Sequence, residues 1–415
     1  MLRSQPPPPH AFASSRGLSA IILSGGGARG AYEAGVLSYL FDEMPRMGAR
    51  MPSFDVVCGT SVGAINAVYL AAHAATPGAG VRRLTDLWTG LELQQVIRFG
   101  VAEALRLPKV LWGGGPDVRG VFDVGPLVEL VSKEIPWRSI ARAINRGHLK
   151  ALAVSATEIK TGRTAVFMQT HPDLPVPTRL GPRSHVVHGL IGPQHALASA
   201  AIPLVFPPVR VGSMLYCDGG LRQNTPMAPA LHLGATRLLV VGLSQDVKGS
   251  VVPEGTAPIT KAPGAPFLLG KLLNAFLLDH VESDIELLER LNELLEVGTS
   301  VYGPDFIDRL SREAVGRGMR GYRQIETLVI RPSEDIGRIA ADHVRRGRVS
   351  GPLITRRLLS SLESEDSEEA DLASYLLFDG GFCRRLIELG RADAHARRSE
   401  LAAFFEDTQE PLPEF

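Results

Sequence analysis

The sequence predicts an α/β fold: a three-layer αβα sandwich with a largely parallel central sheet, to which a C-terminal helical extension is added. Two observations support this prediction. From residue 18 onward, short apolar runs alternate with stretches at helical spacing, and such alternation is typical of parallel sheets. The runs are almost continuously Val, Ile and Leu, which suits strands that are covered on both faces.

The first elements can be placed in chain order. LSAIILS (18–24) is expected to be a strand, and a glycine turn separates it from a helix over 30–43. FDVVCG (54–59) is the second strand and precedes a helix over 61–75. Further strands are expected at 149–157, 163–169, 209–220, 235–244 and 326–332. Glycine and proline loosen the pattern at 86–146 and 163–192, and we expect excursions at the rim of the sheet there.

The same patterns suggest how the chain is divided. Residues 1–16, with four consecutive prolines, predict a flexible tail, and 17–248 hold the main α/β domain. Residues 249–264 are typical of a linker. The remaining 265–415 are expected to be mostly helical, with one strand, 326–332, that could return to the main sheet.

The overall composition of the chain excludes several classes of function. The 44 basic and 44 acidic side chains cancel, which argues against a nucleic-acid partner. Three cysteines without C-x-x-C spacing predict buried free thiols rather than disulfides or a metal site. The N-terminus lacks the apolar core of a signal peptide, and no run is long enough for a transmembrane helix. We therefore expect a cytoplasmic protein, with peripheral membrane contact left open.

The strongest local signal is GTSVG, residues 59–63, between a predicted strand and a predicted helix. This context is the one that a nucleophile elbow requires, with Gly59 and Gly63 as the small neighbours of Ser61. The helix N-terminus would favour negative charge beside the serine. The alternative is a turn in which Ser61 merely caps the helix.

Asp218 is the better candidate for the base that a serine nucleophile needs. None of the histidines after Ser61 lies in a convincing strand-end loop. Asp218 ends an apolar strand, and Gly219 and Gly220 allow a tight turn that we expect to leave the carboxylate exposed at the carboxyl edge of the sheet. An aspartate that touches a serine hydroxyl can act as the base directly. The alternative is an ordinary β-turn aspartate.

The glycine loop GGGARG, residues 25–30, fits two kinds of anion site. Its spacing matches a dinucleotide fingerprint, but that motif needs an acidic residue after the second strand, and Asp42 and Glu43 instead end the first helix. The amides of Gly25, Gly26 and Gly27 could instead donate to the oxyanion of a tetrahedral intermediate, with the positive charge of Arg29 nearby.

Three blocks in this order resemble the patatin-like phospholipase family: G-G-G-x-R-G ending at Gly30, G-T-S-x-G around Ser61, and D-G-G at 218–220. The segment ALASAAIPLVFPP (196–208) is also similar. The resemblance implies a Ser61–Asp218 dyad without histidine, an oxyanion loop at Gly25–Gly27 with Arg29 in the basic position, a lipid ester substrate, and neither metal nor cofactor. Phospholipase, lysophospholipase, triacylglycerol lipase and thioesterase activities all stay open.

Two other functions remain as alternatives. The C-terminal helices, such as 268–278, could dock a membrane or a protein partner, with the α/β domain as a scaffold. A nucleotide-binding oxidoreductase could be built on the first glycine loop.

Overall fold

The computed structural model describes residues 17–97, 123–203, 205–245, 271, 280–317, 321–347 and 371–406. The expected tail at 1–16 and linker at 249–264 lie outside these residues, as does the apolar stretch 268–278 apart from Lys271.

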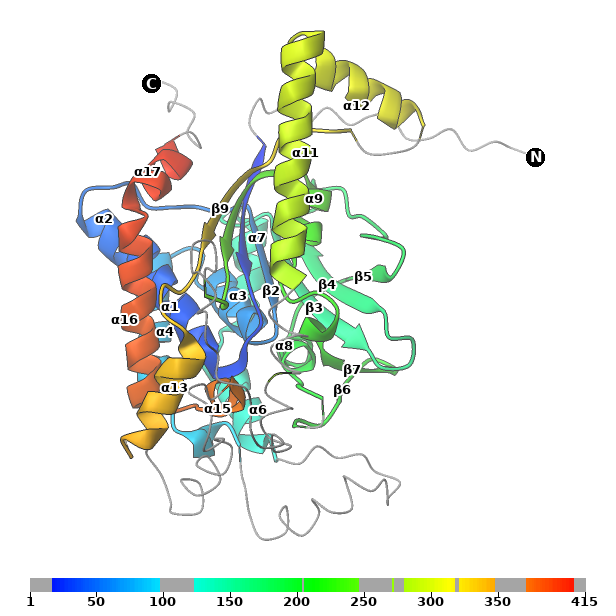
Figure 1. The fold of residues 1–415 in the computed structure, drawn as a ribbon. Coiled ribbons are helices and arrows are strands. Elements are labelled where there is room, and N and C mark those ends of the chain that lie inside the picture. Colours follow the sequence, from blue (N-terminus) through cyan, green and yellow to red (C-terminus); the bar gives the residue numbers. More distant parts are fainter. Residues whose placement is uncertain are drawn as a thin grey trace, which may run out of the picture.

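A mixed sheet forms the centre of the fold, and its middle is parallel (Figure 1). Its nine strands in the described residues are β1 (Leu18–Leu23), β2 (Val56–Thr60), β3 (Ala151–Glu158), β4 (Thr164–Thr170), β5 (Ser184–His188), β6 (Val209–Val211), β7 (Met214–Asp218), β8 (Ala235–Val241) and β9 (Glu326–Ile330). The order is β5-β4-β3-β2-β1-β8-β9, and β3, β2, β1, β8 and β9 pair in parallel. β4 and β7 both pair with β3 in the antiparallel sense.

Helices cover the sheet on both faces. The longer ones are α1 (Gly30–Ser38), α3 (Val62–Ala72), α4 (Pro77–Thr89), α6 (Gly125–Glu134), α7 (Trp137–Asn145), α8 (Pro193–Ser199), α9 (Met227–Leu233), α11 (His280–Tyr302), α12 (Phe306–Gly316), α13 (Ile336–Arg345), α16 (Gly380–Ala396) and α17 (Arg398–Glu406). Short elements are η1 (Gly27–Arg29), the π-helical η2 (Tyr39–Glu43), α2 (Met44–Arg46), η3 (Leu93–Gln95), η4 (Gly219–Leu221) and α15 (Asp371–Leu376). The predicted αβα sandwich with C-terminal helices is confirmed.

The sheet has one hydrophobic core on each face, and the alternation of side chains along the strands explains why there are two. Successive side chains of a strand point to opposite faces, so Ile21 and Leu23 of β1 join the larger core, whereas Ala20 and Ile22 join the smaller one. The larger core is shared with α1, α3, α4, α13 and α16, and the smaller one with α9 and the start of α11. Both faces of β1 are buried, as its continuous apolar run predicted.

Three expectations about elements need correction. The single strand expected at 209–220 is a hairpin of β6 and β7, turned at Gly212 with φ 59°. The segment 163–192 contains the edge strand β5, whose residues are partly exposed and therefore gave no apolar run. The segment 86–146 is not only a loop, since α4 continues to Thr89 and α6 and α7 follow 123.

The C-terminal helices belong to the same layer as α1. Figure 1 shows α1, α4, α13 and α16 grouped along one flank of the sheet, with β9 at its edge beside β8. The backbones of α1 and α16 touch: a Cβ at Gly35 would lie 2.3 Å from the Ile387 oxygen, and one at Gly390 would lie 2.2 Å from the Tyr32 oxygen. Only glycine permits this approach.

The helices α11 and α12 project from one end of the body (Figure 1). One side of α11 packs on the smaller core through Ile285, while Leu287, Leu294 and Val301 on another side are largely exposed. Among the described residues, no helix combines the length and the apolar character needed to cross a bilayer.

Candidate active site

Ser61 lies in a strained turn between β2 and α3. Among the described residues it alone, apart from glycines, has a positive φ, 55° with ψ −127°. The turn is tightly packed, because a Cβ at Gly59 would lie 2.3 Å from the Gly63 oxygen and one at Gly63 2.4 Å from the Leu23 oxygen. Such a conformation costs about 1–3 kcal/mol and persists only where the surroundings impose it.

The Ser61 hydroxyl donates to Asp218 Oδ2 at 2.5 Å. It makes no hydrogen bond that caps α3, so the reading of Ser61 as a simple cap receives no support. The antiparallel register of β7 explains the pairing, because Asp218 lies opposite Ala156 of β3, while Thr60 of β2 lies opposite Ser155. Two residues separated by 157 positions are therefore brought together at one edge of the sheet.

Asp218 is fully buried, so the expectation that its carboxylate is exposed was wrong. Its Oδ1 accepts from the Gly220 amide at 2.7 Å, which fixes the carboxylate plane. Burial raises the pKa of Asp218 from 3.8 to about 7, and the hydrogen bonds from Ser61 and Gly220 offset part of that rise. The carboxyl group can therefore hold or release a proton near neutral pH.

A second serine, Ser199, stabilises the turn at Ser61 through hydrogen bonds. The Ser61 amide donates to Ser199 Oγ at 2.8 Å, and the Ser199 hydroxyl donates to the Ser155 carbonyl at 2.6 Å. Ser199 is fully buried at the end of α8. The sequence placed it in the segment 196–208 that resembled the family, but no local pattern singled it out.

The glycine loop lies against Ser61. A Cβ at Gly25 would lie 2.9 Å from the Ser61 Cβ and 2.3 Å from Asn224 Oδ1, so only glycine fits. The Gly25 amide donates to the Asn224 carbonyl at 3.3 Å, and Asn224 Nδ2 donates to the Gly25 carbonyl at 3.1 Å. Among the described residues, the amides of Gly26 and Gly27 have no hydrogen-bond acceptor. These two amides are the donors that a ligand oxygen could use.

Arg29 is buried at the start of α1, and its side chain faces the C-terminal segment. Its Nε donates to Ser374 Oγ at 2.8 Å, and its guanidinium lies 4.4 Å from the centre of the Tyr375 ring. Gly27 approaches the same segment, because a Cβ there would lie 2.3 Å from the Tyr375 oxygen. The short helix α15 therefore holds the glycine loop in place.

The dinucleotide alternative lacks its acidic partner. β2 ends at Thr60 and is followed by Ser61, so no acidic side chain stands at its carboxyl end. Asp42 lies in η2, where Arg82 and Arg46 pair with its Oδ1 at 2.5 and 2.9 Å.

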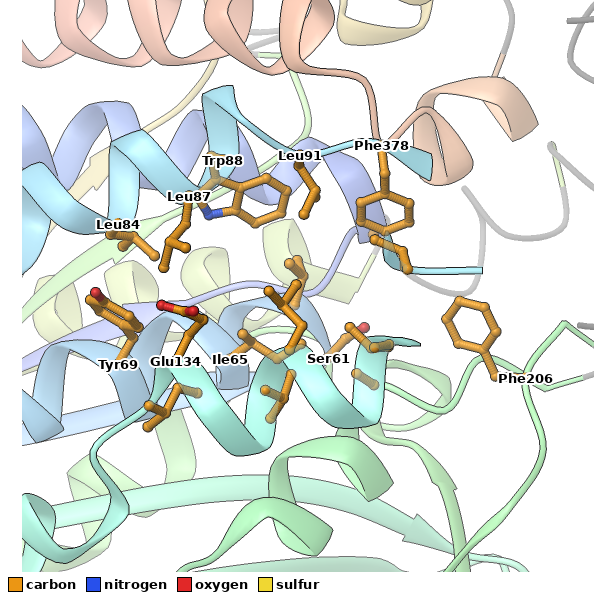
Figure 2. Close-up of a pocket in the computed structure, with 18 of the residues that line it drawn as sticks. Ser61, Ile65, Tyr69, Leu84, Leu87, Trp88, Leu91, Glu134, Phe206 and Phe378 are labelled. Atoms are coloured by element: carbon orange, nitrogen blue, oxygen red, sulfur yellow. The ribbon is translucent and has the colours of Figure 1, made fainter. Parts of the chain in front are cut away.

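An apolar channel starts at Ser61 (Figure 2). Its empty volume is about 780 Å³, counted with the space that is open to solvent. Side chains of α3, α4 and α6 line it, together with Ala200 and Ile202. Phe206 and Phe378 lie at the end near Ser61 (Figure 2). A lining that is almost wholly apolar is typical of ligand sites.

A buried polar network lies behind one wall of the channel. Trp88 Nε1 donates to Asn66 Oδ1 at 3.2 Å, and Asn66 Nδ2 donates to Glu33 Oε2 at 2.8 Å. Burial raises the pKa of Glu33 well above its ordinary value, so a neutral carboxyl group is expected there. The network fixes the indole of Trp88, which lines the channel.

Other candidate groups contribute nothing to this site. In the described part of the chain, no histidine hydrogen-bonds to Ser61 or Asp218, and no cluster of His, Cys, Asp and Glu could hold a metal ion. Cys58, Cys217 and Cys383 are all buried and free, as predicted.

Comparisons with known proteins give a family and one clear relative. A family model described as patatin-like phospholipase matches residues 21–231. A cGAMP-activated phospholipase from Pseudomonas aeruginosa is 31% identical over 239 residues, which cover 58% of this chain and 62% of that protein. The match thus spans less than two thirds of the relative. VipD from Legionella pneumophila aligns over 90% of this chain and 67% of its own, at 13% identity and TM-score 0.30. The type III effector ExoU aligns over 92% and 54%, at 15% identity and TM-score 0.29.

Proposed function

The chain belongs to the patatin-like phospholipase family, and on this basis we propose that it is a serine hydrolase of lipid carboxylic esters, with Ser61 as nucleophile and Asp218 as base. The observation that carries the proposal is the 2.5 Å hydrogen bond from the Ser61 hydroxyl to Asp218 Oδ2, in a turn with positive φ. A serine that only stabilised the fold would not need this strained backbone.

The first half of the proposed reaction forms an acyl-enzyme. Asp218 Oδ2 takes the proton of Ser61 as Oγ attacks the ester carbonyl carbon. The carbonyl oxygen becomes an oxyanion, which accepts hydrogen bonds from the Gly26 and Gly27 amides. One such donor is worth about 3 kcal/mol of transition-state stabilisation. The tetrahedral intermediate then collapses, and the departing alcohol takes the proton from Asp218.

The second half restores the enzyme. Asp218 removes a proton from water, whose oxygen attacks the acyl carbon, and a second oxyanion forms at the same amides. Its collapse releases the fatty acid, and Ser61 recovers its proton from Asp218. No step needs a metal or a cofactor. Peripheral contact with a membrane, from which the lipid would be drawn, stays a prediction.

Two substitutions test the dyad. We expect Ser61→Ala and Asp218→Asn each to lower kcat by at least about 10⁴-fold, because the two residues act as one unit. The measurements are hydrolysis of p-nitrophenyl esters and labelling of Ser61 with a fluorophosphonate probe. Thr299→Ala, on α11, is the control and should keep both.

Circular dichroism of the variants separates chemistry from folding. A folded Ser61→Ala or Asp218→Asn protein with wild-type hydrolysis would contradict the dyad. Wild-type protein that takes no probe but binds NAD(P) would favour the oxidoreductase alternative.

A further inference from the structure

The apolar channel runs along α3 away from Ser61. Val62, Ile65 and Tyr69 line it, and this spacing places all three on one side of the helix. In Figure 2, Ser61 lies toward one end of the channel and Tyr69 at the other. An ester whose carbonyl carbon is at Ser61 Oγ would therefore direct its acyl chain along α3 toward Tyr69.

Two further helices complete the walls. α4 contributes Leu84, Leu87 and Trp88, and α6 contributes Leu127, Leu130 and Val131. Each set repeats at helical spacing, so α4 and α6 each present an apolar row to the channel. Figure 2 shows Leu84 beside Tyr69 and Leu91 nearer to Ser61.

A charged pair borders the end of the channel at Tyr69. Glu134 is part of the lining there, and its Oε2 pairs with Arg83 Nη2 at 2.9 Å. The charges of Arg83, Glu134 and Asp86 act on the Tyr69 hydroxyl, and Tyr69 as a whole is only 3% exposed. His73 stacks on the far side of that ring, with centroids 4.4 Å apart. A methyl terminus gains nothing from contact with an ion pair, because the charges would lose water without gaining a partner.

Resting on the proposed function, we propose that Tyr69, Arg83 and Glu134 set the length of acyl chain that the enzyme accepts. Tyr69 lies eight positions after Ser61, which is about 12 Å at 1.5 Å per helical residue. A C–C bond of about 1.5 Å at a tetrahedral angle advances an extended chain by about 1.25 Å. The channel therefore holds acyl chains of about eight to twelve carbons, and longer chains meet the polar end.

The chain-length profile of the wild-type enzyme is the first test. We measure kcat/KM for p-nitrophenyl butyrate, octanoate, decanoate, laurate and palmitate in the same mixed micelles. The value should rise by up to about fourfold per added methylene within the channel, and fall at palmitate. Palmitate hydrolysed as well as decanoate would overturn the inference. No hydrolysis of any ester, with no probe labelling, would instead contradict the proposed function.

Variants at the two ends of the cluster make the second test. Tyr69→Ala removes a ring of roughly 5 Å, equal to about four carbons. We expect it to raise the palmitate-to-octanoate ratio of kcat/KM at least tenfold. Glu134→Leu replaces the charge by an apolar side chain and should raise the same ratio. It is the variant of choice if Tyr69→Ala does not fold, because the Glu134 side chain is already 23% exposed.

One control and one channel-filling variant keep the readout specific. Tyr302→Ala is the matched control, since Tyr302 is 65% exposed on α11 and does not line the channel. Its ratio should equal that of the wild type. Ile65→Phe fills the channel halfway and should lower the laurate-to-butyrate ratio. Unchanged ratios in both Tyr69→Ala and Glu134→Leu would overturn the inference.

Discussion

The Ser61–Asp218 pair has a built-in conflict between stability and activity. A carboxyl group with no exposure to water is more stable when it is neutral, yet the proposed chemistry requires it as a base. The pKa of Asp218 is raised to about 7 for this reason, because burial favours the neutral carboxyl group. Its position close to physiological pH is what general base catalysis favours.

The pH dependence of activity follows from this pKa. Asp218 must be deprotonated to accept the Ser61 proton, so kcat/KM should rise with pH through an inflection at about 7. The measurement is the pH–rate profile of a short p-nitrophenyl ester. An inflection at the ordinary value of an aspartate, near 4, would contradict the raised pKa of Asp218.

The same shift predicts a stability difference. Between pH 3.8 and about 7, the unfolded chain has lost the Asp218 proton while the native protein keeps it, so stability falls as pH rises through this window. The total is on the order of 4 kcal/mol, at 1.36 kcal/mol per pH unit. Asp218→Asn carries no such charge, and we expect it to unfold at higher denaturant concentration than the wild type at about pH 8. Equal midpoints above pH 7 would contradict a buried ionised Asp218.

Sequence reasoning could identify Ser61 and Asp218 because each sits in a motif with its own strand. It could not foresee that Asp218 is buried or that Ser199 holds the Ser61 amide. Both facts depend on side chains that come together only in the folded protein. Their catalytic roles stay predictions, as does that of the glycine loop.

At the scale of elements, the glycine loop and α15 behave as one unit. Arg29 could act in two ways: its charge could stabilise the oxyanion directly, or its contacts with Ser374 and Tyr375 could position the loop. The hydrogen bond to Ser374 is buried, which favours positioning.

Ser374→Ala distinguishes these two roles. It keeps the charge of Arg29 but removes a buried acceptor, so a positioning role predicts a fall in kcat of about 10-fold with little change in KM. A direct role predicts no change. Arg385→Ala is the control, because Arg385 forms an exposed pair with Glu334 and should leave kcat unchanged.

Strands with long apolar runs could be predicted from the sequence, whereas strands with few apolar residues could not. β1, β2 and β8 carry continuous buried runs, whereas the sequence of β5, SHVVH, is polar at both ends. The sequence predicts a single strand where the β6–β7 hairpin lies, because only two residues separate the two strands. Strand pairing decides such cases, and the apolar content of a segment alone does not reveal which strands pair.

At the scale of the whole molecule, the C-terminal helices complete the layer that carries the glycine loop. The contact of Gly35 with Gly390 brings α1 and α16 together, and Tyr32 Oη donates to Asp393 Oδ2 at 3.0 Å across the same interface. The division into 17–248 and 265–415 stays a prediction about sequence. In the structure, α16 from the C-terminal region packs directly on α1 from the N-terminal region.

Gly390→Val tests how much this interface matters. The new side chain would meet the Tyr32 carbonyl, so we expect a loss of roughly 2–4 kcal/mol in unfolding free energy and a weaker esterase, although Gly390 does not line the channel. Urea denaturation measures the loss. Gly316→Val is the matched control, because a Cβ there has no heavy atom within 4 Å, and valine has a higher helix propensity than glycine, so no loss of stability is expected. Equal losses in the two variants would contradict a tight α1–α16 contact.

The bond between Arg29 and Ser374 spans 345 positions of the chain, and this separation has a consequence during protein synthesis. At about 5–20 residues per second, the ribosome needs roughly 20 to 70 seconds to proceed from one to the other. Ser61 is therefore made long before the segment that contacts the glycine loop exists. We expect a nascent chain stalled before residue 371 to resist a fluorophosphonate probe, so that the growing polypeptide stays inert toward lipids until its last helices are translated.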